Sequence, residues 1–285
     1  MREQEMGLRG FFHKIKIALT RMCAPSIPHC SEAEQYGEQG ELALAKEIQA
    51  RLPACRIKKN VLVQASEGHA EIDLLILYKN KLFAIEVKRW QGRITEQDDR
   101  FIQYKRDRWT EEIHTKVHKS PFKQIGRAIY LLRKENPENA WINSVVFFKE
   151  AERIDTTGTN LWFNDIDDLL SHIQNGGKPS WGRQAELFFD RCIAADHLYR
   201  QSRGQALHCI ILDESLRFAT PQGMLTRKDI RSISITHHPC YDELLIKTVS
   251  GRIFCVALEN GSISVTVNGC RRSYALCKLD HIQLG

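Results

Sequence analysis

The 285-residue sequence contains neither a long uninterrupted hydrophobic run nor a pair of cysteines separated by two residues. In residues 10–22, the most apolar part of the N-terminal region, lysines interrupt the hydrophobic residues. This segment is therefore not expected to span a membrane or to act as a secretory signal. The nine cysteines are an odd number in a chain too long to need disulfides for stability. We therefore expect a reduced, cytoplasmic protein.

No known zinc-ligand spacing occurs either, although several histidines and cysteines lie close together near the C-terminus. They are His237, His238, Cys240, Cys255, Cys270, Cys277 and His281. These residues could in principle hold zinc, but small buried cysteines and surface histidines are the simpler interpretation.

Residues 1–33 form a basic, partly amphipathic segment, which Pro25 and Pro28 separate from the sequence that follows. A helix of this kind can lie on a membrane surface, contact nucleic acid, or dock on the rest of the protein. Docking or disorder is the favoured interpretation, and membrane association is the less favoured one.

Two buried strands joined by a tight turn dominate the sequence, at residues 72–78 and 82–87. Both are short, rich in β-branched and aromatic residues, and apolar on both faces, as is typical of central strands. A two-residue turn at Lys79-Asn80 would place Asp73 opposite Glu86, with Cβ atoms about 4.5–5.5 Å apart. Two carboxylates at this spacing repel unless a cation lies between them, and a divalent metal is the natural occupant.

Two alternatives to this metal site remain open. A three-residue turn would shift the register by one residue and move Glu86 to the other face, unless a bulge compensates. The charges could also form a salt-bridged patch on a solvent-facing strand, which the apolar neighbours on both faces make less favourable. Lys88 shares the face of Glu86, because side chains alternate along a strand.

An ordered set of motifs resembles the nuclease-related domain (NERD) family of the restriction-endonuclease-like superfamily, whose signature is Asp, a spacer, and then Glu-x-Lys. The resemblance covers about residues 34–175. The motifs are Gly37-Glu38-Gln39-Gly40-Glu41, Asn60-Val61, Glu71-Ile72-Asp73, Glu86-Val87-Lys88, Gly92-Arg93-Ile94, Trp109 and Ser120-Pro121-Phe122-Lys123-Gln124. The Glu-x-Lys tripeptide alone is weak evidence, whereas the ordered set is specific.

The resemblance implies roles for individual residues. Asp73 and Glu86 would bind Mg²⁺ or Mn²⁺, with the carbonyl of Val87 as a further ligand. Glu41 occupies the position of a family glutamate that projects into the site, where it would help to bind a second metal or a metal-coordinated water. Gln124 matches a glutamine that contacts substrate or such a water in related nucleases; an ordinary exposed glutamine is the alternative.

Lys88 has two possible roles at such a site. A free lysine has a pKa of about 10.4 and is a poor base at neutral pH. Either its pKa is lowered, or it acts as a cation that orients water and stabilises developing charge, which demands less of its surroundings.

A polyanionic partner fits the charge distribution. The net charge is only +6, but basic residues outnumber acidic ones about two to one between Lys79 and Lys134, next to the expected site. Residues 101–109 interleave aromatic and basic residues, which suits phosphates and bases, although a twisted edge hairpin with a charged outer face is equally possible. The expected nucleic-acid contacts are Arg89, Arg93, Lys119, Lys123 and Arg127.

The predicted fold class is α/β (α+β). We expect a restriction-endonuclease-like mixed sheet flanked by helices over residues 34–175, a Gly- and Pro-containing linker at 176–180, and a second domain over 181–285. The second domain begins with an amphipathic helix at 181–199. It continues as short strands separated by turn pairs such as Ser250-Gly251, which predict a small antiparallel β domain.

We therefore expect a metal-dependent nuclease acting on nucleic acid, with DNA preferred over RNA as the expected substrate. The C-terminal β domain shows no catalytic pattern and is a candidate surface for a homo-oligomer or a protein partner. The alternatives are a catalytically silent nucleic-acid-binding protein and a membrane-associated assembly protein. Defence and repair are processes suggested only by analogy with the superfamily.

Overall fold

A computed structural model describes residues 16, 19–24, 26–28, 31–107, 109–200, 205–238, 241–259 and 261–285. The chain forms two compact units. The α/β unit is Glu32–Ala194, and the β unit is Ala195–Gly285 together with the N-terminal residues up to Ser31. Most of the expected basic N-terminal segment, including residues 1–15, lies outside the described residues. Within the described part of the chain, no helix is both long and apolar enough to cross a membrane.

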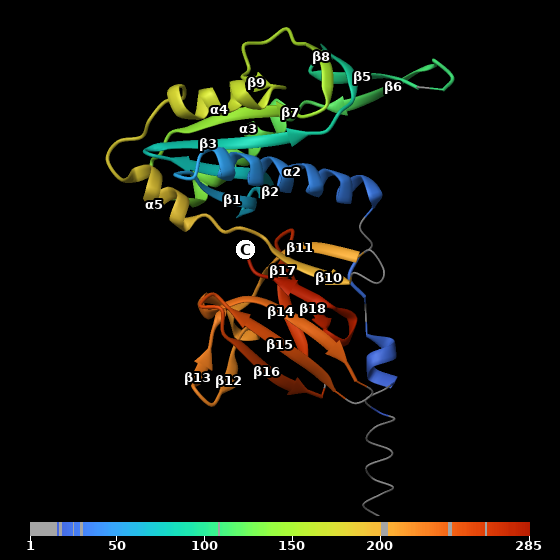
Figure 1. Cartoon of the computed structure of the whole chain (residues 1–285), viewed down its shortest axis with the longest axis vertical. Coiled ribbons are helices and arrows are strands. Elements are labelled where there is room, and N and C mark those ends of the chain that lie inside the picture. The colour runs from blue at the N-terminus through green and yellow to red at the C-terminus, as the bar shows by residue number, and fades with distance from the viewer. Residues whose placement is uncertain are drawn as a thin grey trace, which may run out of the picture. The chain divides into compact units, whose positions relative to one another are not determined.

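A five-stranded mixed sheet, in the order β1-β2-β3-β7-β9, lies at the centre of the α/β unit (Figure 1). Its strands are β1 (Arg56–Ala65), β2 (Gly68–Tyr78), β3 (Lys81–Lys88), β7 (Ile142–Phe148) and β9 (Trp162–Phe163). The strands β1, β2 and β3 pair antiparallel, whereas β7 lies parallel to β3 and β9 parallel to β7. Because β3 and β7 are parallel, the connection between them is a crossover.

Helices cover both faces of this sheet. They are α2 (Glu32–Arg51), α3 (Pro121–Glu135), α4 (Ile166–Asn175) and α5 (Gln184–Arg191). One face packs on α2 and α4, where Ile48 and Leu169 share a core with Ile85 of β3. The other face packs on α3, where Ile125 shares a core with Ala84. Because side chains alternate along β3, Glu86 and Lys88 project on the same face as Ala84, toward α3.

A second, four-stranded sheet follows the end of β3, in the order β6-β5-β4-β8. Its strands are β4 (Gly92–Gln97), β5 (Arg100–Arg106), β6 (Ile113–Lys119) and β8 (Ala151–Asp155). Ile94 and Phe101 anchor this sheet in the same core as Ala84. The edge strand β6 is exposed at every position except His118, which is half-buried.

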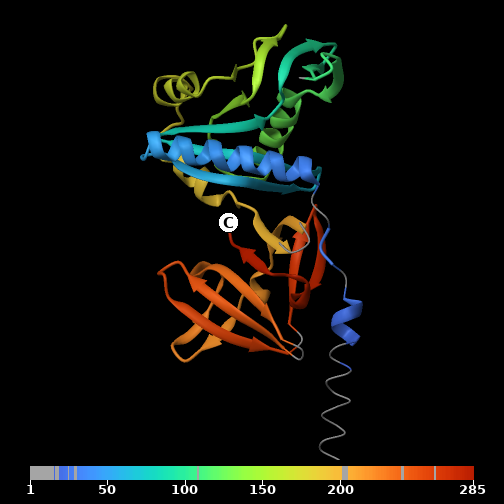
Figure 2. The same ribbon diagram turned by 45° about the vertical axis from the view of Figure 1, so that its right-hand side comes forward.

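The β unit consists of an eight-stranded antiparallel sheet and a small hairpin, as Figure 2 shows in orange to red. Ile27 of the N-terminal segment is buried in its core. The sheet contains β10 (Asp196–Arg200), β11 (Gln205–Ile211), β14 (Ile230–His237), β15 (Asp242–Thr248), β16 (Ile253–Leu258), β17 (Ser262–Val267), β18 (Cys270–Ala275) and β19 (His281–Gln283). The hairpin is β12 (Phe218–Thr220) with β13 (Gly223–Leu225), and three 3₁₀ turns lie at Asp213–Ser215, Arg227–Asp229 and Leu276–Lys278.

The mixed α/β class is confirmed, but the boundary between the units differs from the predicted linker at 176–180. Those residues are fixed against the sheet, since Lys178 N–H donates to Asn143 Oδ1 at 2.7 Å and Ser180 N–H donates to the Asn80 carbonyl at 2.9 Å. Phe188 of α5 is buried in the α/β core, so this helix belongs to the first unit.

The helix predicted at 181–199 is also shorter than expected. It covers Gln184–Arg191, and the chain has become strand β10 by Asp196. Leu198, inside the range predicted as a helix, is instead fully buried in the β unit. The apolar residues in this range are spaced as in one continuous helix. In the structure they belong to α5, which packs in the α/β core, and to β10, which packs in the core of the β unit.

Candidate functional site

The predicted hairpin register is confirmed at the turn. Tyr78 pairs with Lys81, and the same register continues to Leu74 opposite Ile85. Lys79 adopts a φ of 54° at the first turn position, a conformation that tight two-residue hairpin turns require. Leu74 and Ile85 are the last pair of this register, and Asp73 and Glu86 are the residues that follow it on β2 and β3.

Asp73 lies at the point where β2 and β3 separate. Its Oδ2 accepts a hydrogen bond of 2.7 Å from the backbone N–H of Val87. Burial raises the pKa of Asp73, and the nearby charge of Glu86 raises it further. Two carboxylates are therefore held close together at a site that disfavours their negative charge.

Glu86 is almost completely buried, with a side chain that is 1% exposed. Its Oε1 accepts a hydrogen bond of 2.5 Å from Lys88 Nζ. Its Oε2 is buried and has no hydrogen-bond partner among the described residues. Burial is the main cause that raises the pKa of Glu86, and it outweighs the lowering effect of Lys88.

Lys88 joins Glu86 to helix α3. In addition to its bond with Glu86, its Nζ donates to Gln124 Oε1 at 3.3 Å. Gln124 is held in the first turn of α3, which begins with Pro121 after the N-cap Ser120. Burial alone would lower the pKa of Lys88, but Glu86 and Asp73 together outweigh it and raise the pKa above its ordinary value. Lys88 is therefore a cation at neutral pH.

Glu41 approaches from helix α2. Its Oε2 accepts a hydrogen bond of 3.0 Å from Asn60 Nδ2, and Asn60 is 3% exposed with a φ of 48°. Glu41 also raises the pKa of both Glu86 and Lys88, which shows that its charge acts on the site. Sequence reasoning missed the role of Asn60; its place in the Asn60-Val61 motif was the only signal.

The donor set fits a hard divalent cation. Carboxylate oxygens of Asp73 and Glu86 lie together, and the orphaned Glu86 Oε2 is a buried acceptor that a cation would satisfy. Among the described residues, no third acidic, histidine or cysteine side chain completes a preformed cluster with these two. Mg²⁺ commonly binds through one or two carboxylates and keeps waters and phosphate oxygens as its other ligands, so such a site needs no further cage.

Three of the predicted nucleic-acid contacts lie beside Gln124. Lys119, Lys123 and Arg127 line a cavity of about 560 Å³ together with Gln124, Arg100, Ser120, Asp98 and Asp99. Lys123 pairs with Asp99 at 2.7 Å, and Arg127 donates to the backbone carbonyl of Glu67 at 3.2 Å. Four cations against two acids make this cavity positively charged where it approaches Lys88.

Arg89, also predicted as a nucleic-acid contact, instead packs inside the α/β unit. Its guanidinium lies 3.3 Å from the centre of the Tyr36 ring and pairs with Glu150 at 2.6 Å. A Cβ on Gly40 would meet Arg89 Cδ at 2.2 Å, so this glycine permits the close approach. A basic residue with these partners stabilises the α2 interface rather than presenting its charge to a ligand.

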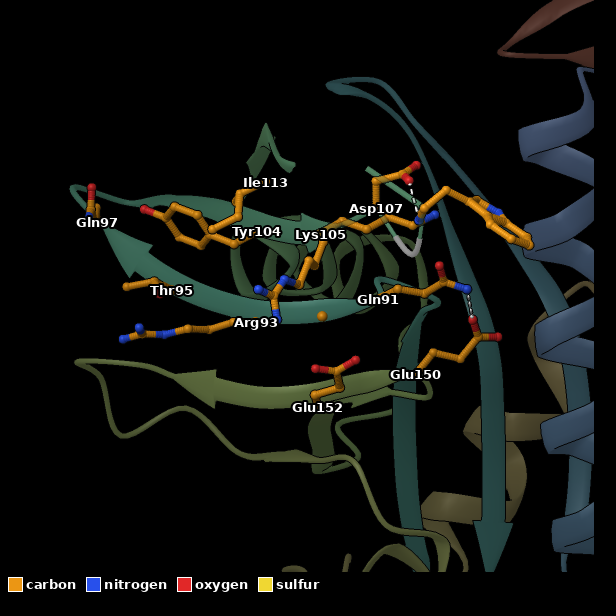
Figure 3. A pocket seen from close by; sticks show the side chains of 13 residues that line it. Gln91, Arg93, Thr95, Gln97, Tyr104, Lys105, Asp107, Ile113, Glu150 and Glu152 are labelled. Carbon is orange, nitrogen blue, oxygen red and sulfur yellow. Dashed lines mark hydrogen bonds between the residues drawn. The ribbon is translucent and has the colours of Figure 1, made fainter. Parts of the chain in front are cut away.

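Arg93 lies away from Gln124, in a groove of about 1140 Å³ formed beside β4, β5 and β8 (Figure 3). It pairs with Asp155 at 2.8 Å. Glu150, on another wall, accepts a hydrogen bond of 2.9 Å from Gln91 Nε2. The geometry therefore separates the five predicted contacts into three beside Gln124, one packed inside the unit, and one in a separate groove.

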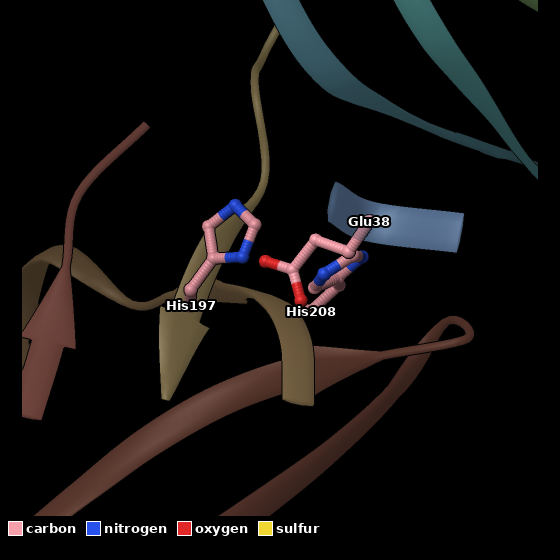
Figure 4. A group of neighbouring side chains, drawn as sticks. All are labelled: Glu38, His197 and His208. Carbon is pink, nitrogen blue, oxygen red and sulfur yellow. The ribbon is translucent and has the colours of Figure 1, made fainter. Parts of the chain in front are cut away.

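The β unit contains a histidine pair that sequence reasoning did not identify. His197 of β10 and His208 of β11 are directly opposite each other, with ring centres 4.4 Å apart (Figure 4). Two of the residues that could in principle hold zinc have other partners: His237 contacts Asp242 at 2.9 Å and Cys255 donates to Glu243 at 2.8 Å. Cys240 lies outside the described residues.

Comparison with known proteins gives one match. Residues 36–149, from α2 to the end of β7, match the family model of the nuclease-related domain. Neither the curated proteins nor the solved structures include a match to the chain. The matched range contains Glu41, Asp73, Glu86, Lys88 and Gln124, and it confirms the resemblance stated from the sequence.

Proposed function

Because the chain contains a nuclease-related domain at residues 36–149, we propose that its α/β unit is a metal-dependent nuclease that hydrolyses phosphodiester bonds. The observation that carries the proposal is Glu86 Oε2, a buried carboxylate oxygen without a partner among the described residues. It lies in a site that also contains Asp73 and the cation Lys88. Most buried polar groups have a hydrogen-bond partner, and an unpaired carboxylate oxygen beside a second carboxylate favours a bound cation as the missing partner.

Asp73 and Glu86 are the proposed ligands of Mg²⁺ or Mn²⁺, with the Val87 carbonyl as a further ligand. Glu41, held by Asn60, is the third carboxylate that acts on the site. A bound divalent ion would neutralise charge on the phosphate and activate water for attack. The Val87 N–H bond to Asp73 fixes the orientation of that carboxylate before any ligand binds.

Lys88 acts as a fixed cation in this proposal. Without metal, Glu86 and Asp73 raise the pKa of Lys88, so the site holds an ammonium group before a metal binds, which favours the cation role over the general base. Glu86 and Gln124 hold the ammonium group, from which it can orient the attacking water and stabilise negative charge that develops on the phosphate. Gln124 has the positioning role, because it contacts Lys88.

The restriction-endonuclease-like arrangement is part of the proposal. It is supported by the central strand β3, which carries Glu86-Val87-Lys88 and pairs antiparallel with β2 and parallel with β7. Helices on both faces complete the arrangement. We take DNA as the preferred substrate, and RNA as the alternative that the assay below distinguishes.

The test is cleavage of labelled linear, circular and single-stranded DNA and of RNA, each with Mg²⁺, with Mn²⁺ and with EDTA. Glu86→Gln and Lys88→Met should reduce cleavage to background. The matched controls are Glu47→Gln and Lys46→Met on the exposed side of α2, which should cleave like the unaltered protein. Equal cleavage by Glu86→Gln and the unaltered protein would contradict the proposal. Metal-independent binding without cleavage would instead favour a catalytically silent nucleic-acid-binding protein.

A further inference from the structure

The hairpin of β5 and β6 is not used by the proposed chemistry. We infer that it is an arm that binds a single-stranded segment of nucleic acid, with its lysines and arginines on phosphates and Trp109 stacked on a base. The inference rests on the proposed function for the class of its ligand. It adds a preference for unpaired strands, and a second binding region beyond the catalytic residues.

The two strands of the arm carry positive charge only. Within Arg100–Arg106 and Ile113–Lys119 there is no aspartate or glutamate, whereas five lysines and arginines occur. They are Arg100, Lys105, Arg106, Lys116 and Lys119. Arg100 faces Lys119 at the base, and Lys116 and Lys105 lie two rungs apart toward the tip. Because side chains alternate along a strand, Lys105 and Lys116 share one face of the ribbon, and Arg100, Arg106 and Lys119 share the other. Cations on both faces of an exposed ribbon suit contact with a phosphate backbone.

The tip of the arm holds a tryptophan in solvent on an ordered turn. Trp109 is 94% exposed. Asp107 Oδ1 accepts hydrogen bonds from the N–H groups of Trp109 at 2.8 Å and Thr110 at 2.9 Å, and Asp107 N–H donates to the Glu112 carbonyl at 2.8 Å. Asp107 thus holds the backbone of Trp109 and Thr110, while the Trp109 side chain is almost completely exposed. An exposed ring on an ordered support is suited to stacking on a base.

The base of the arm leads directly to the candidate site. Arg100 and Lys119 line the cavity of about 560 Å³ that also contains Gln124, and Gln124 accepts a hydrogen bond from Lys88. His118 anchors the arm, because its ring stacks on Trp90 at 4.1 Å between centres. A strand lying along the arm would therefore reach Lys88 through a positively charged cavity.

Lys105, Arg106 and Trp109 of the arm also line the larger groove of about 1140 Å³, but this groove is a weaker candidate for the phosphate path toward Lys88. Its three cations, Arg93, Lys105 and Arg106, are balanced by three acids, Asp107, Glu150 and Glu152. A polyanion gains little from a groove without net positive charge.

The charges also favour nucleic acid over a second copy of this chain. Ile113 and Val117 are 66% and 56% exposed on the edge strand β6, which is the kind of edge on which two copies can pair. Such pairing would bring Lys116 and Lys119 of both copies together, and like charges on an edge oppose it. An intact duplex offers its base faces only at its ends, so the exposed ring of Trp109 favours an unpaired strand.

Binding of a fluorescein-labelled single strand and of a blunt duplex of the same sequence, measured by anisotropy in EDTA, tests the role of Trp109. The single strand should bind more tightly than the duplex. Trp109→Ala should weaken single-strand binding about five- to 150-fold, as expected for one lost stacking contact. Trp181→Ala removes another tryptophan of the same unit, 87% exposed, and should change nothing. If Trp109→Ala binds the single strand with the same affinity as the unaltered protein, the inference that the arm binds single strands is wrong.

The salt dependence of the same binding tests the cations. The double variant Lys105→Ala with Lys116→Ala should reduce the slope of log K against log salt by about 1.4, for two lost contacts to a single strand. Lys46→Ala with Lys247→Ala changes the net charge equally at exposed sites elsewhere and should leave the slope unchanged. An unchanged slope in the first variant would contradict phosphate contacts along the arm.

Failure of the arm and failure of the proposed function are distinguishable. If cleavage persists but binding does not depend on Trp109, the inference about the arm is wrong and the proposed nuclease activity stands. If binding depends on Trp109 but no cleavage occurs with either metal, the inference about the arm is supported and the proposed nuclease activity is wrong. Sedimentation that shows a dimer which Trp109→Ala dissociates would identify the tip as an interface between copies and overturn the inference.

Discussion

Buried acids in the two units have opposite surroundings. In the β unit, Asp196 is 0% exposed and fully paired. Arg227 donates to its two oxygens at 2.6 and 2.7 Å, and the N–H groups of Ile211 and Gly285 donate at 2.8 and 3.1 Å. In the α/β unit, Glu86 is equally buried but has only Lys88 as a hydrogen-bond donor, and one of its oxygens has no partner among the described residues.

The two buried carboxylates differ in whether their hydrogen bonds are satisfied by the fold itself, and this difference distinguishes a structural acid from a candidate ligand-binding acid. A buried carboxylate with all its hydrogen bonds satisfied holds strands together, as Asp196 does for β10 and β11. A buried carboxylate whose pKa is raised by burial costs stability, and such groups concentrate at functional sites. The comparison locates the candidate site without reference to any family, since it uses only burial and hydrogen bonding.

The largest effect on stability is expected where the pairing is complete. Arg227→Ala leaves Asp196 buried without its cation, which should lower the free energy of unfolding by about 3–5 kcal/mol. Urea denaturation followed by circular dichroism measures this loss. Arg217→Ala removes an exposed arginine of the same unit and should cost much less. A loss below about 1 kcal/mol in Arg227→Ala would mean that the pair does not stabilise the fold.

A substitution at the candidate site is expected to change the free energy of unfolding in the opposite direction. Asp73→Asn keeps an oxygen for the Val87 N–H and removes a buried charge that repels Glu86. Without metal, the variant should be more stable than the unaltered protein, on the order of 1–3 kcal/mol. With Mg²⁺ at 100 times its dissociation constant, the unaltered protein should gain about 2.7 kcal/mol.

The variant should lose that gain, because it lacks one of the two carboxylates expected to bind the ion. Thermal unfolding with Mg²⁺ and with EDTA measures both effects. If Asp73→Asn is destabilised as strongly as Arg227→Ala, the two kinds of buried acid do not differ and the comparison fails.

The hairpin that carries the site was predictable because local rules determine it. A two-residue turn and the two-residue period of a strand together fix which side chains face one another, so Asp73, Glu86 and Lys88 follow from the sequence.

What the sequence did not predict depends on contacts between distant segments. Arg89 follows a strand, as an exposed arginine would, and only the Tyr36 and Gly40 neighbours reveal that it packs inside. In the sequence Asn60 is only a polar residue within a strand, and its role becomes visible in the hydrogen bond that it donates to Glu41. The apolar side of α5 indicates burial but not the core in which it is buried, and the unit boundary was misplaced for that reason.

The last prediction concerns a pH-dependent effect of His118, a half-buried group of the α/β unit that is paired through one nitrogen. Its Nε2 lies 3.0 Å from Gln103 Oε1, and its ring stacks on Trp90. Burial, with the charges of Lys116 and Lys88, lowers the pKa of His118 to about 4. In the unfolded chain the pKa returns to about 6.5, so between pH 6.5 and 4 the unfolded state binds more protons and stability falls as pH falls.

A titration of the His118 ring protons by NMR should therefore show a midpoint near 4 in the folded protein and near 6.5 in urea. His118→Gln identifies the resonance and removes this contribution, so the variant should lose less stability than the unaltered protein between pH 6.5 and 4. A folded-state midpoint near 6.5 would mean that the ring is not desolvated against Trp90. Burial would then be a poor guide to the free-energy cost of charging this group. The contrast between Asp196 and Glu86 would have to rest on hydrogen bonding alone.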